Sequence, residues 1–391
     1  MKLCSLAIST CLLCQITIMS RVNAQVIVNH DSLNVEELRI DKAQQYMPAV
    51  FKPLANRVNQ YELQINQARN LTALTQLTLR HSAALWKDGV KSFDEVGQYD
   101  DRTLYWARLQ MSKALKSSPA YKNLLPVQQQ NLQWQLELIS RGKNDVKFDK
   151  GTDKKILITG FDPFFLDRNI DQSNPSGVAA LALDDLVIRR DGKSAEIESL
   201  IVPVRFADFD KGMIETLLAP YYNKVDMIIT ISMGRENFDL ERFPGLRRSA
   251  KAPDNLNVYT GANNEAPLKP VFLGKNLPGD EFVEFSLPVT AMNKATGHYK
   301  INDNRMVTTI TKKFTPQTLK ELKGEVSVQG SGGGYLSNEI SYRSLVLRNE
   351  KNPVLPVGHI HTPRIKAYQP KASENIVKQI KQMLTHAINA I

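Results

Sequence analysis

The spacing of hydrophobic residues divides the chain into two parts. From residue 31 to 143, apolar residues recur at helical intervals, glycines are few and good helix formers are frequent. One such run consists of Leu104, Ala107, Met111 and Leu115. Residues 25–150 are therefore predicted to form an α-helical domain.

Two features of this part allow alternatives. Residues 132–138 alternate between apolar and polar positions, as in a strand, but their Gln- and Leu-rich surroundings favour a buried helix. Trp86, Trp106 and Trp134 are predicted to be core residues, with a ligand platform as the alternative. The helical part carries no catalytic constellation, and we expect it to pack over or beside the rest of the chain as a cover.

The pattern changes after a polar, glycine-containing segment at 140–154, the predicted linker. Short apolar runs then alternate with helical stretches. Strands are predicted at 156–158, 197–204 and 225–231, and helices at 179–188 and 213–221. This alternation is typical of βαβ units, so residues 151–391 are predicted to form an α/β domain with a mainly parallel sheet flanked by helices.

The remainder of this domain is predicted in less detail. Further strands are expected at 325–329 and 354–361, followed by an amphipathic terminal helix with Ser373 as its N-cap. That helix carries Ile376, Ile380, Leu384 and Ile388 on one face. Residues 256–324 mix turn residues with short apolar runs, which indicates extended loops or an added hairpin.

The first 24 residues have the pattern of a secretory signal peptide. Lys2 precedes an apolar stretch at 3–19, and Val22-Asn23-Ala24 provides a small-residue cleavage pattern. We expect a periplasmic or secreted protein with no stable membrane span after cleavage. An uncleaved anchor is the alternative, although the apolar stretch is short for a bilayer.

Composition narrows the chemistry of the mature chain. All three cysteines lie within residues 1–24, so the mature chain would have no disulfide, no thiolate and no cysteine-based zinc site, which suits an oxidising compartment. Without residues 1–24 the chain has 48 basic and 40 acidic residues, a net charge of +8. The basic residues are dispersed and accompany no nucleic-acid-binding motif, which indicates a solvated basic surface and no nucleic-acid partner.

In open α/β sheets, ligands bind beyond the carboxyl ends of the strands, and the turns at those positions hold unusual residues here. In chain order they are Gly160-Phe161-Asp162-Pro163-Phe164, Asn174-Pro175-Ser176, Gly234-Arg235 with Glu241-Arg242, Pro253-Asp254-Asn255, Gly332-Gly333-Gly334-Tyr335-Leu336-Ser337-Asn338 and Ile360-His361-Thr362-Pro363. Each motif alone is weak evidence, but the ordered set is specific.

These motifs occur in the same order in pyroglutamyl peptidase I, a family of cysteine peptidases. Residues from about 154 to the C-terminus resemble that family, and residues 25–150 lie outside the resemblance. The resemblance implies a pyroglutamyl peptidase-like α/β fold and a hydrolase that removes N-terminal pyroglutamyl residues from peptides, without a cofactor or metal.

The resemblance also implies roles for individual residues. Glu241 and His361 stand at the family's catalytic Glu and His, and Ser337 stands where the family has its nucleophilic Cys. Phe161 and Phe164 fall on the turn that packs against the pyroglutamyl ring, and Asn174, Arg235 and Asp254 fall at positions near the substrate. A nucleophile, a base and an orienting carboxylate are also the parts that acyl transfer requires.

Several residues depart from the family pattern. A hydroxyl must lose its proton during attack, whereas a cysteine can be present as a thiolate, so Ser337 is the most serious departure. Phe165 and Leu166 replace glycines after the first turn and are expected to narrow the pocket, and Met233 replaces another glycine. Glu339 would place a carboxylate where it disfavours an oxyanion.

The sequence also allows other interpretations. A catalytically silenced homologue that binds pyroglutamyl peptides or a protein partner is the main alternative. The glycines at 332–334 could cradle a phosphate, but no Lys-Ser/Thr follows them. His359 and His361 alternate on one strand and could bind a metal, although no third ligand is evident. The oligomeric state is open, a homo-oligomer included.

Overall fold

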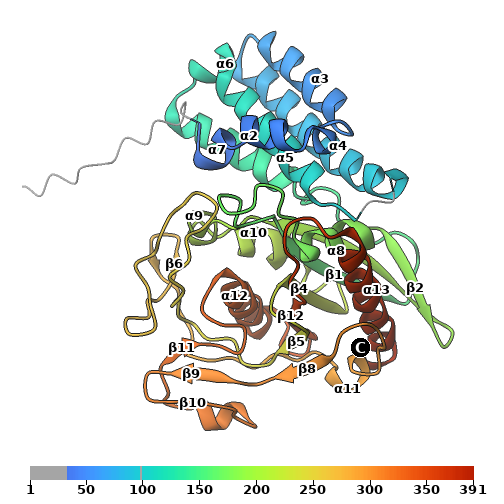
Figure 1. The fold of residues 1–391 in the computed structure, drawn as a ribbon, viewed down its shortest axis with the longest axis vertical. Helices are drawn as coiled ribbons and strands as arrows, with labels where there is room; N and C mark the ends of the chain where they lie inside the picture. The colour runs from blue at the N-terminus through green and yellow to red at the C-terminus, as the bar shows by residue number, and fades with distance from the viewer. Residues whose placement is uncertain (1–32, 97–98) are drawn as a thin grey trace, which may run out of the picture.

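The computed structural model describes residues 33–96 and 99–391. In this range the chain forms a helical part and an α/β part, which Figure 1 shows stacked one above the other. The predicted signal peptide, residues 1–24, lies outside the described residues, and so do all three cysteines. Among the helices that are described, none has the length and apolar character needed to cross a membrane.

The N-terminal part consists of helices joined by short turns. They are α1 Val35–Leu38, α2 Ile40–Tyr46, α3 Ala55–Asn66, α4 Leu71–Val96, α5 Arg102–Ser117, α6 Pro119–Lys122 and α7 Pro126–Ile139, with a 3-10 turn at Pro48–Phe51. The helical interpretation of residues 132–138 is confirmed, because they lie in α7. Trp86 and Trp106 are fully buried, and Trp134 packs partly buried against the core, as predicted.

The α/β part is built on a seven-stranded sheet. Its strands, in spatial order, are β2 Leu186–Arg190, β3 Lys193–Val202, β1 Lys154–Phe161, β4 Met227–Met233, β12 Val357–Thr362, β5 Phe238–Glu241 and β8 Ile301–Asn304. The pairs β1/β3, β1/β4, β4/β12 and β5/β8 are parallel, whereas β2/β3 and β5/β12 are antiparallel. The predicted mainly parallel sheet is therefore confirmed.

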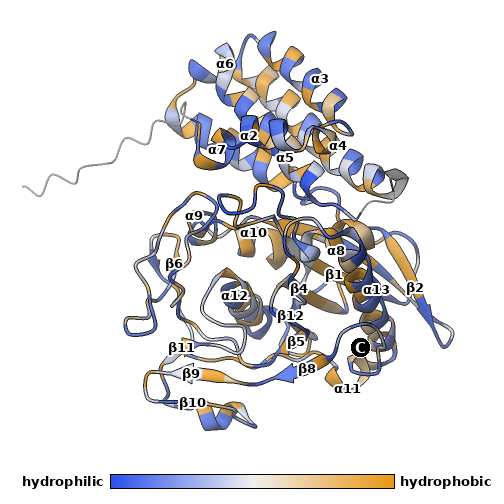
Figure 2. Cartoon of the chain, in the orientation of Figure 1, coloured by the Kyte–Doolittle hydropathy of each residue, from blue (hydrophilic) through white to orange (hydrophobic). Residues whose placement is uncertain are grey.

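Helices cover both faces of this sheet. The helices of the α/β part are α8 Pro175–Leu183, α9 Phe206–Asp210, α10 Met213–Leu218, α11 Val289–Met292, α12 Leu336–Lys351 and α13 Pro370–Ala387, and α8, α12 and α13 contact the sheet directly. α8 packs between the sheet, α13 and α4 of the helical part, so nearly all of its residues are apolar and buried. In Figure 2, β1 and α8 are coloured hydrophobic, whereas the N-terminal helices alternate between hydrophobic and hydrophilic positions.

The C-terminal ends of β1, β4 and β12 meet at one edge of the sheet. The register places Thr159 beside Thr230, and His361 beside Ser232. Because parallel strands end at the same edge, the residues that follow these three strands converge there. This edge carries the candidate site.

Residues 256–324 contain more regular structure than expected. β6 Val271–Phe272 and β7 Lys275–Asn276 form the expected added hairpin. β8 extends the main sheet, while β9 Val307–Thr309, β10 Lys313–Phe314 and β11 Ser327–Gln329 form a second, three-stranded sheet. The strand predicted at 325–329 thus lies outside the main sheet.

Two helix boundaries were predicted wrongly. The helix predicted at 179–188 ends at Leu183, because Asp185 adopts a positive φ of 60° and the chain turns back into β2. Ser373 is not the N-cap of the terminal helix: it is buried inside α13, which begins at Pro370. Proline favours the first helical position because its fixed φ suits the helix and its missing N–H would be unpaired there.

The start of the predicted linker is buried between the two parts. Ser140 and Arg141 are completely buried, and the carbonyl oxygen of Arg141 accepts a hydrogen bond from the amide of Ile201 on β3 at 3.1 Å. A side chain at Gly142 would lie 2.9 Å from the ring of Trp86, so only glycine fits there. One hydrophobic cluster also runs continuously from the helical part into the sheet.

Buried ion pairs join the helical part to the α/β part. We call the group the interface ion network, and it consists of Glu36, Arg108, Glu137, Arg141, Asp162, Arg205 and Asp208. Its centre is Asp162, in the turn after β1, whose carboxylate accepts hydrogen bonds from Arg108 on α5 and from Arg141 at 2.7 Å. Glu137 on α7 pairs with Arg141 at 2.8 Å and with Arg205 at 2.9 Å.

The network compensates charges that would be costly to bury separately. Burial alone would raise the pKa of Glu137, but Arg205, Arg141 and Arg108 together hold it well below its usual value. Removing one member would leave a buried charge without its partner, which usually costs about 3–5 kcal/mol. The network therefore makes the two parts depend on each other.

We expect Arg141→Met to reduce the free energy of unfolding by about 3–5 kcal/mol, because Glu137 and Asp162 would remain buried without this cation. Denaturant unfolding followed by circular dichroism measures the change. Lys87→Met is the matched control, since Lys87 is exposed and lies 3.6 Å from Asp145, and it should cost less than about 1 kcal/mol. Equal effects of the two substitutions would contradict this role of the network.

Candidate active site

A histidine and a glutamate form a short hydrogen bond at this edge of the sheet. Nδ1 of His361, on β12, lies 2.6 Å from Oε1 of Glu241, the last residue of β5. His361 pairs with Asp239 across the two strands, so Glu241, two residues farther along, lies on the same face. A carboxylate acceptor at Nδ1 favours the tautomer that leaves Nε2 unprotonated, which a general base requires.

Glu241 is itself held by a second partner. Nδ2 of Asn304, on β8, donates to Oε2 of Glu241 at 2.9 Å and to the carbonyl oxygen of Ser331 at 3.0 Å. Burial raises the pKa of Glu241, and the hydrogen bond from His361 acts in the opposite direction. Asn304 was not identified from the sequence, because nothing there indicates that β8 pairs with β5.

The backbone passes close to His361 at two glycines. A Cβ at Gly234 would lie 2.6 Å from Cβ of His361, so only glycine fits at this position in the turn after β4. A Cβ at Gly332 would lie 3.4 Å from Cε1 of the same ring. The glycine-rich segment before α12 therefore passes directly beside the imidazole.

Ser337 stands in the first turn of α12 and faces the same cavity as His361. Its side chain is half-buried, and its hydroxyl donates to the carbonyl oxygen of Gly332 at 3.4 Å, a long hydrogen bond. Amides in the first turn of a helix have no intrahelical acceptor, so the amide of Ser337 is suited to bind an oxyanion. The amide of Gly333 is already used, because it donates to Gly330 at 2.9 Å.

A cavity of about 250 Å³ lies beside Ser337 and His361. Its lining is Phe161, Phe164, Phe165, Asn174, Val204, Ser232, Met233, Gly234, Arg235, Ala250, Ala252, Gly332, Tyr335, Leu336, Ser337, His361 and Arg364. This volume suits a small ring rather than a large side chain. Every lining residue belongs to the α/β part. The helical part therefore does not cover the cavity, contrary to the expectation from the sequence.

Aromatic side chains form one wall of this cavity. The rings of Phe164 and Phe165 lie 4.3 Å apart, and Phe165 has a positive φ of 64°, which is strained for a residue other than glycine. Leu166 does not enter the cavity: it is buried against Ile40, Trp106 and other residues of the helical part. Of the two residues expected to narrow the pocket, only Phe165 lines it.

The remaining candidate residues divide into two groups. Asn174 lines the cavity and also caps α8, because its Oδ1 accepts from the amide of Ser176 at 3.1 Å. Arg235 lines the cavity with an exposed side chain, and Met233 is a further lining residue. Asp254 lies outside the lining, with its carboxylate bound by the backbone amides of Phe206, Leu256 and Val258 at 2.8–3.0 Å. Asp254 therefore holds these backbone segments together and does not line the cavity.

Glu339 and His359 are both bound within the fold. The carboxylate of Glu339 accepts from Arg248 at 2.6 Å and from Arg343 at 2.9 Å, which compensates the charge that was expected to disfavour an oxyanion. The two ring nitrogens of His359 lie 2.8 Å from the hydroxyl of Thr230 and 2.7 Å from that of Ser232. Burial lowers the pKa of His359 well below its usual value, so this ring is neutral.

Side chains from the helical part hold the turns that line the cavity. Arg108 and Arg141 bind Asp162, which lies between the lining residues Phe161 and Phe164. Asp101 accepts from the amide of Asn174 at 3.1 Å, and burial raises the pKa of Asp101 to about 8. Glu36 and Arg39 bind Asn255, and Asn255 in turn donates to the carbonyl oxygen of Pro163 at 2.8 Å. None of these contacts was predicted, because each joins residues that are distant in the chain.

Comparison with known proteins places the chain in a family. A family model described as the PA0049 C-terminal domain matches residues 155–320 and 292–366, which together span more than half of the chain, and the PA0049 N-terminal domain matches residues 20–137. The chain belongs to the PA0049 family. "Uncharacterized protein PA0049" of Pseudomonas aeruginosa is 29% identical over 69% of this chain, which spans 64% of that relative's length, just under two thirds.

This PA0049 family member is also similar to pyrrolidone-carboxylate peptidases. The enzyme of Clostridium botulinum is 26% identical over 54% of this chain and 79% of its own length. The enzyme of Lacticaseibacillus paracasei is 25% identical over 54% of this chain and 77% of its own length. Solved structures of a mutant pyrrolidone carboxyl peptidase from Pyrococcus furiosus and of pyroglutamyl peptidase I from Bacillus amyloliquefaciens are each 21% identical. Each match covers 61% of this chain. It covers 99% of the Pyrococcus furiosus chain and 98% of the Bacillus amyloliquefaciens chain, and both TM-scores are 0.41.

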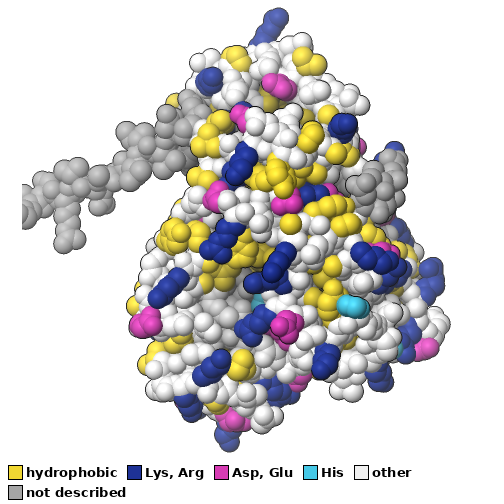
Figure 3. All heavy atoms as spheres, viewed as in Figure 1, with side chains coloured by type: hydrophobic (Ala, Val, Ile, Leu, Met, Phe, Trp, Pro, Cys, Tyr) yellow, Lys and Arg dark blue, Asp and Glu magenta, His cyan; other side chains and the backbone are white. Residues whose placement is uncertain are grey.

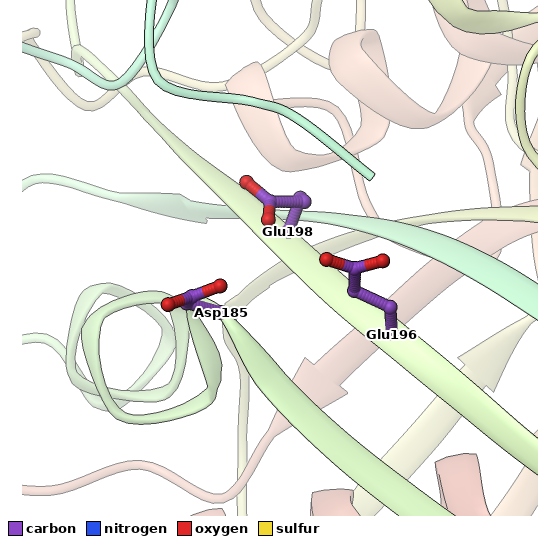
Figure 4. Close-up of side chains that lie close together, drawn as sticks. All are labelled: Asp185, Glu196 and Glu198. Carbon is purple, nitrogen blue, oxygen red and sulfur yellow. The ribbon is translucent and has the colours of Figure 1, made fainter. Parts of the chain in front are cut away.

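A cluster of acidic side chains lies at the end of the sheet that is formed by β2 and β3. Figure 4 shows Glu196 and Glu198 projecting from the same strand, β3, with Asp185 across from them, and their oxygen atoms lie within 4.8 Å of one another. The ammonium group of Lys150 pairs with Asp185, and the amide of Lys150 donates to Glu196 at 3.2 Å. Burial, together with Asp184, raises the pKa of Glu198 to about 9. Lys150 and a proton on Glu198 therefore offset the negative charge from within the chain.

We expect Glu198→Gln to stabilise the protein increasingly as the pH rises from 5 to 9. The folded protein keeps the proton of Glu198 up to about pH 9, while the unfolded chain releases it near pH 4.5, so the wild type loses stability across this window as the pH increases. Glutamine is neutral throughout. Thermal unfolding at several pH values measures the difference, with the exposed Glu62→Gln on α3 as the control. A constant difference from pH 5 to 9 would refute the assignment.

Proposed function

We propose that this chain is a hydrolase that removes N-terminal pyroglutamyl residues from peptides, with Ser337 in place of the cysteine of pyroglutamyl peptidase I. The observation that carries the proposal is the 2.6 Å hydrogen bond between His361 and Glu241, in a cavity that Ser337 also lines. The distant similarity to pyrrolidone-carboxylate peptidases supports the same reaction class. The pattern of residues 1–24 supports a periplasmic or secreted location.

The proposed reaction proceeds in two steps. Oγ of Ser337 attacks the carbonyl carbon that joins the pyroglutamyl residue to the next residue, outside the lactam ring. Nε2 of His361 accepts the hydroxyl proton at the same time. His361 then gives that proton to the leaving amine as the C–N bond breaks, which leaves an ester on Ser337. Water hydrolyses the ester with His361 again as base. Glu241 orients the imidazole and stabilises its charged form, as the carboxylate does in other triads.

The cavity supports this substrate class through size and polarity. Its aromatic wall of Phe161, Phe164 and Phe165 suits the apolar faces of a five-membered lactam ring. The first-turn amide of Ser337 suits the oxygen that becomes negative in the tetrahedral intermediate. Neither feature requires a cofactor.

A silenced homologue that binds pyroglutamyl peptides or a protein partner is the second candidate. One observation favours it: the hydroxyl of Ser337 donates to Gly332 rather than to His361. Hydrogen bonds between catalytic groups are often long or misaligned before substrate binds. This geometry is therefore compatible with both the hydrolase and the silenced homologue, and the activity assay distinguishes them.

We expect the mature protein to release the chromophore from a chromogenic pyroglutamyl amide slowly. Ser337→Ala should reduce the rate to background, because it removes the attacking oxygen. Initial rates across a range of enzyme concentrations measure the difference. Ser373→Ala, a buried serine on α13 outside the cavity, controls for the loss of a hydroxyl as such. If wild type and Ser337→Ala give the same background, the enzyme proposal fails.

We also expect Ser337→Cys to increase the rate about tenfold or more, equivalent to about 1.4 kcal/mol in the barrier. A thiol ionises more readily than a hydroxyl, and the helix N-terminus would lower its pKa further. The assay needs a reducing buffer, and a small alkylating probe should react with the new thiol. If the thiol reacts with the probe but no substrate is cleaved, the cavity does not accept the ring and the binding function is favoured.

A further inference from the structure

Basic side chains surround the mouth of the candidate active site. We use the term cationic rim for Arg235, Arg364 and Lys366, which are all exposed. Arg235 and Arg364 line the active-site cavity, and together with Glu236 and Lys366 they line an adjacent hollow of about 430 Å³. On the face drawn in Figure 3, Lys and Arg side chains gather over the middle of the α/β part, beside a patch of hydrophobic side chains.

The rim cations have no ion-pair partner within the described residues, in contrast to nearby arginines. Arg242, Arg247 and Arg248 each pair with at least one carboxylate at 2.6–3.4 Å. Glu236 is the one acidic residue that lines the adjacent hollow, and no described ion pair joins it to a rim cation. The hollow therefore combines three positive charges with one negative charge.

The backbone fixes the rim beside the reacting groups. The amide of Arg364 donates to the carbonyl oxygen of Arg235 at 2.6 Å, and the amide of Gly234 donates to that of Thr362 at 2.8 Å. These bonds join the segment after β4 to the segment after β12, immediately next to His361. A substrate held with its ring in the aromatic cavity would extend its following residue toward this mouth.

Two further cations add to the local positive field. The guanidinium of Arg168 lies over the ring of Phe165, 5.5 Å from its centre. Lys251 is exposed and stands between the lining residues Ala250 and Ala252. Neither forms an ion pair among the residues that the structure describes, so both reinforce the attraction for an anion.

We propose that the cationic rim binds a carboxylate on the part of the substrate that follows the pyroglutamyl ring. This inference rests on the proposed function and specifies its substrate class as acidic pyroglutamyl peptides. The carboxylate can come from an acidic side chain next to the ring or from the C-terminus of a pyroglutamyl dipeptide. Arginine suits this role because its planar fork binds a carboxylate through two hydrogen bonds.

Binding to Ser337→Ala protein tests the inference without turnover. Calorimetry compares pyroglutamyl-glutamyl-glycinamide with pyroglutamyl-glutaminyl-glycinamide for the side-chain source, and pyroglutamyl-alanine with its amide for the C-terminal source. We expect at least one acidic ligand to bind about fivefold more tightly than its neutral counterpart, since exposed ion pairs contribute modestly. Raising the salt concentration should reduce this preference, because the rim is exposed.

Substitutions in the same background assign the preference to the rim. Arg364→Gln should lower the affinity for the acidic ligand more than that for the neutral ligand, so that most of the preference is lost. Arg189→Gln is the matched control, since Arg189 is an exposed arginine on the edge strand β2, outside the cavity, and the preference should persist.

The outcomes separate this inference from the function on which it rests. If acidic and neutral pyroglutamyl ligands bind equally, or if Arg364→Gln lowers both affinities alike, the rim does not select substrates and the proposed function still stands. If no pyroglutamyl ligand binds at all, the proposed function fails, and this inference fails with it.

Discussion

The carboxylate of Asp162, buried between two arginines, is the contact on which the site depends most. Asp162 lies in the turn after β1, between two phenylalanines of the cavity wall, and its partners Arg108 and Arg141 belong to the helical part. A buried carboxylate is tolerated only with such partners, so this turn can take its shape only when the helices are in place. The helical part thus supports the cavity wall from outside, without lining the cavity.

The segment after this turn extends the same support. Residues 165–173 provide contacts with the helices: Leu166 and Ile170 are buried against the helical part, and Asp167 pairs with Arg39 at 2.6 Å. Phe165, at the start of this segment, lines the cavity instead. One segment therefore contributes both to the cavity wall and to the docking surface for the helices.

Local patterns in the sequence predicted the fold class and part of the site. Apolar runs located the strands that end at the site, and the motifs after them located Glu241, Ser337 and His361 in their vicinity. Contacts between distant segments could not be predicted, because a single sequence carries no signal for partners such as Asn304 for Glu241 or Arg108 for Asp162, which are 63 and 54 residues apart. The predictions of helix boundaries were wrong where the local chemistry was ambiguous. The serine at 373 resembled an N-cap, but the proline at 370 sets the start of α13.

The position of the Ser337 hydroxyl is compatible with catalysis on energetic grounds. Its hydrogen bond to Gly332 is 3.4 Å long, beyond the usual range for a hydroxyl donor, and is therefore weak. A serine hydroxyl is reoriented by rotation about its Cα–Cβ and Cβ–Oγ bonds, so giving up this weak hydrogen bond costs little compared with the barrier to amide hydrolysis. For the proposed reaction, the demanding requirement is a base with the correct tautomer, and the short bond between His361 and Glu241 favours that tautomer. The chemical difference from a cysteine at this position is then the higher proton affinity of the serine hydroxyl.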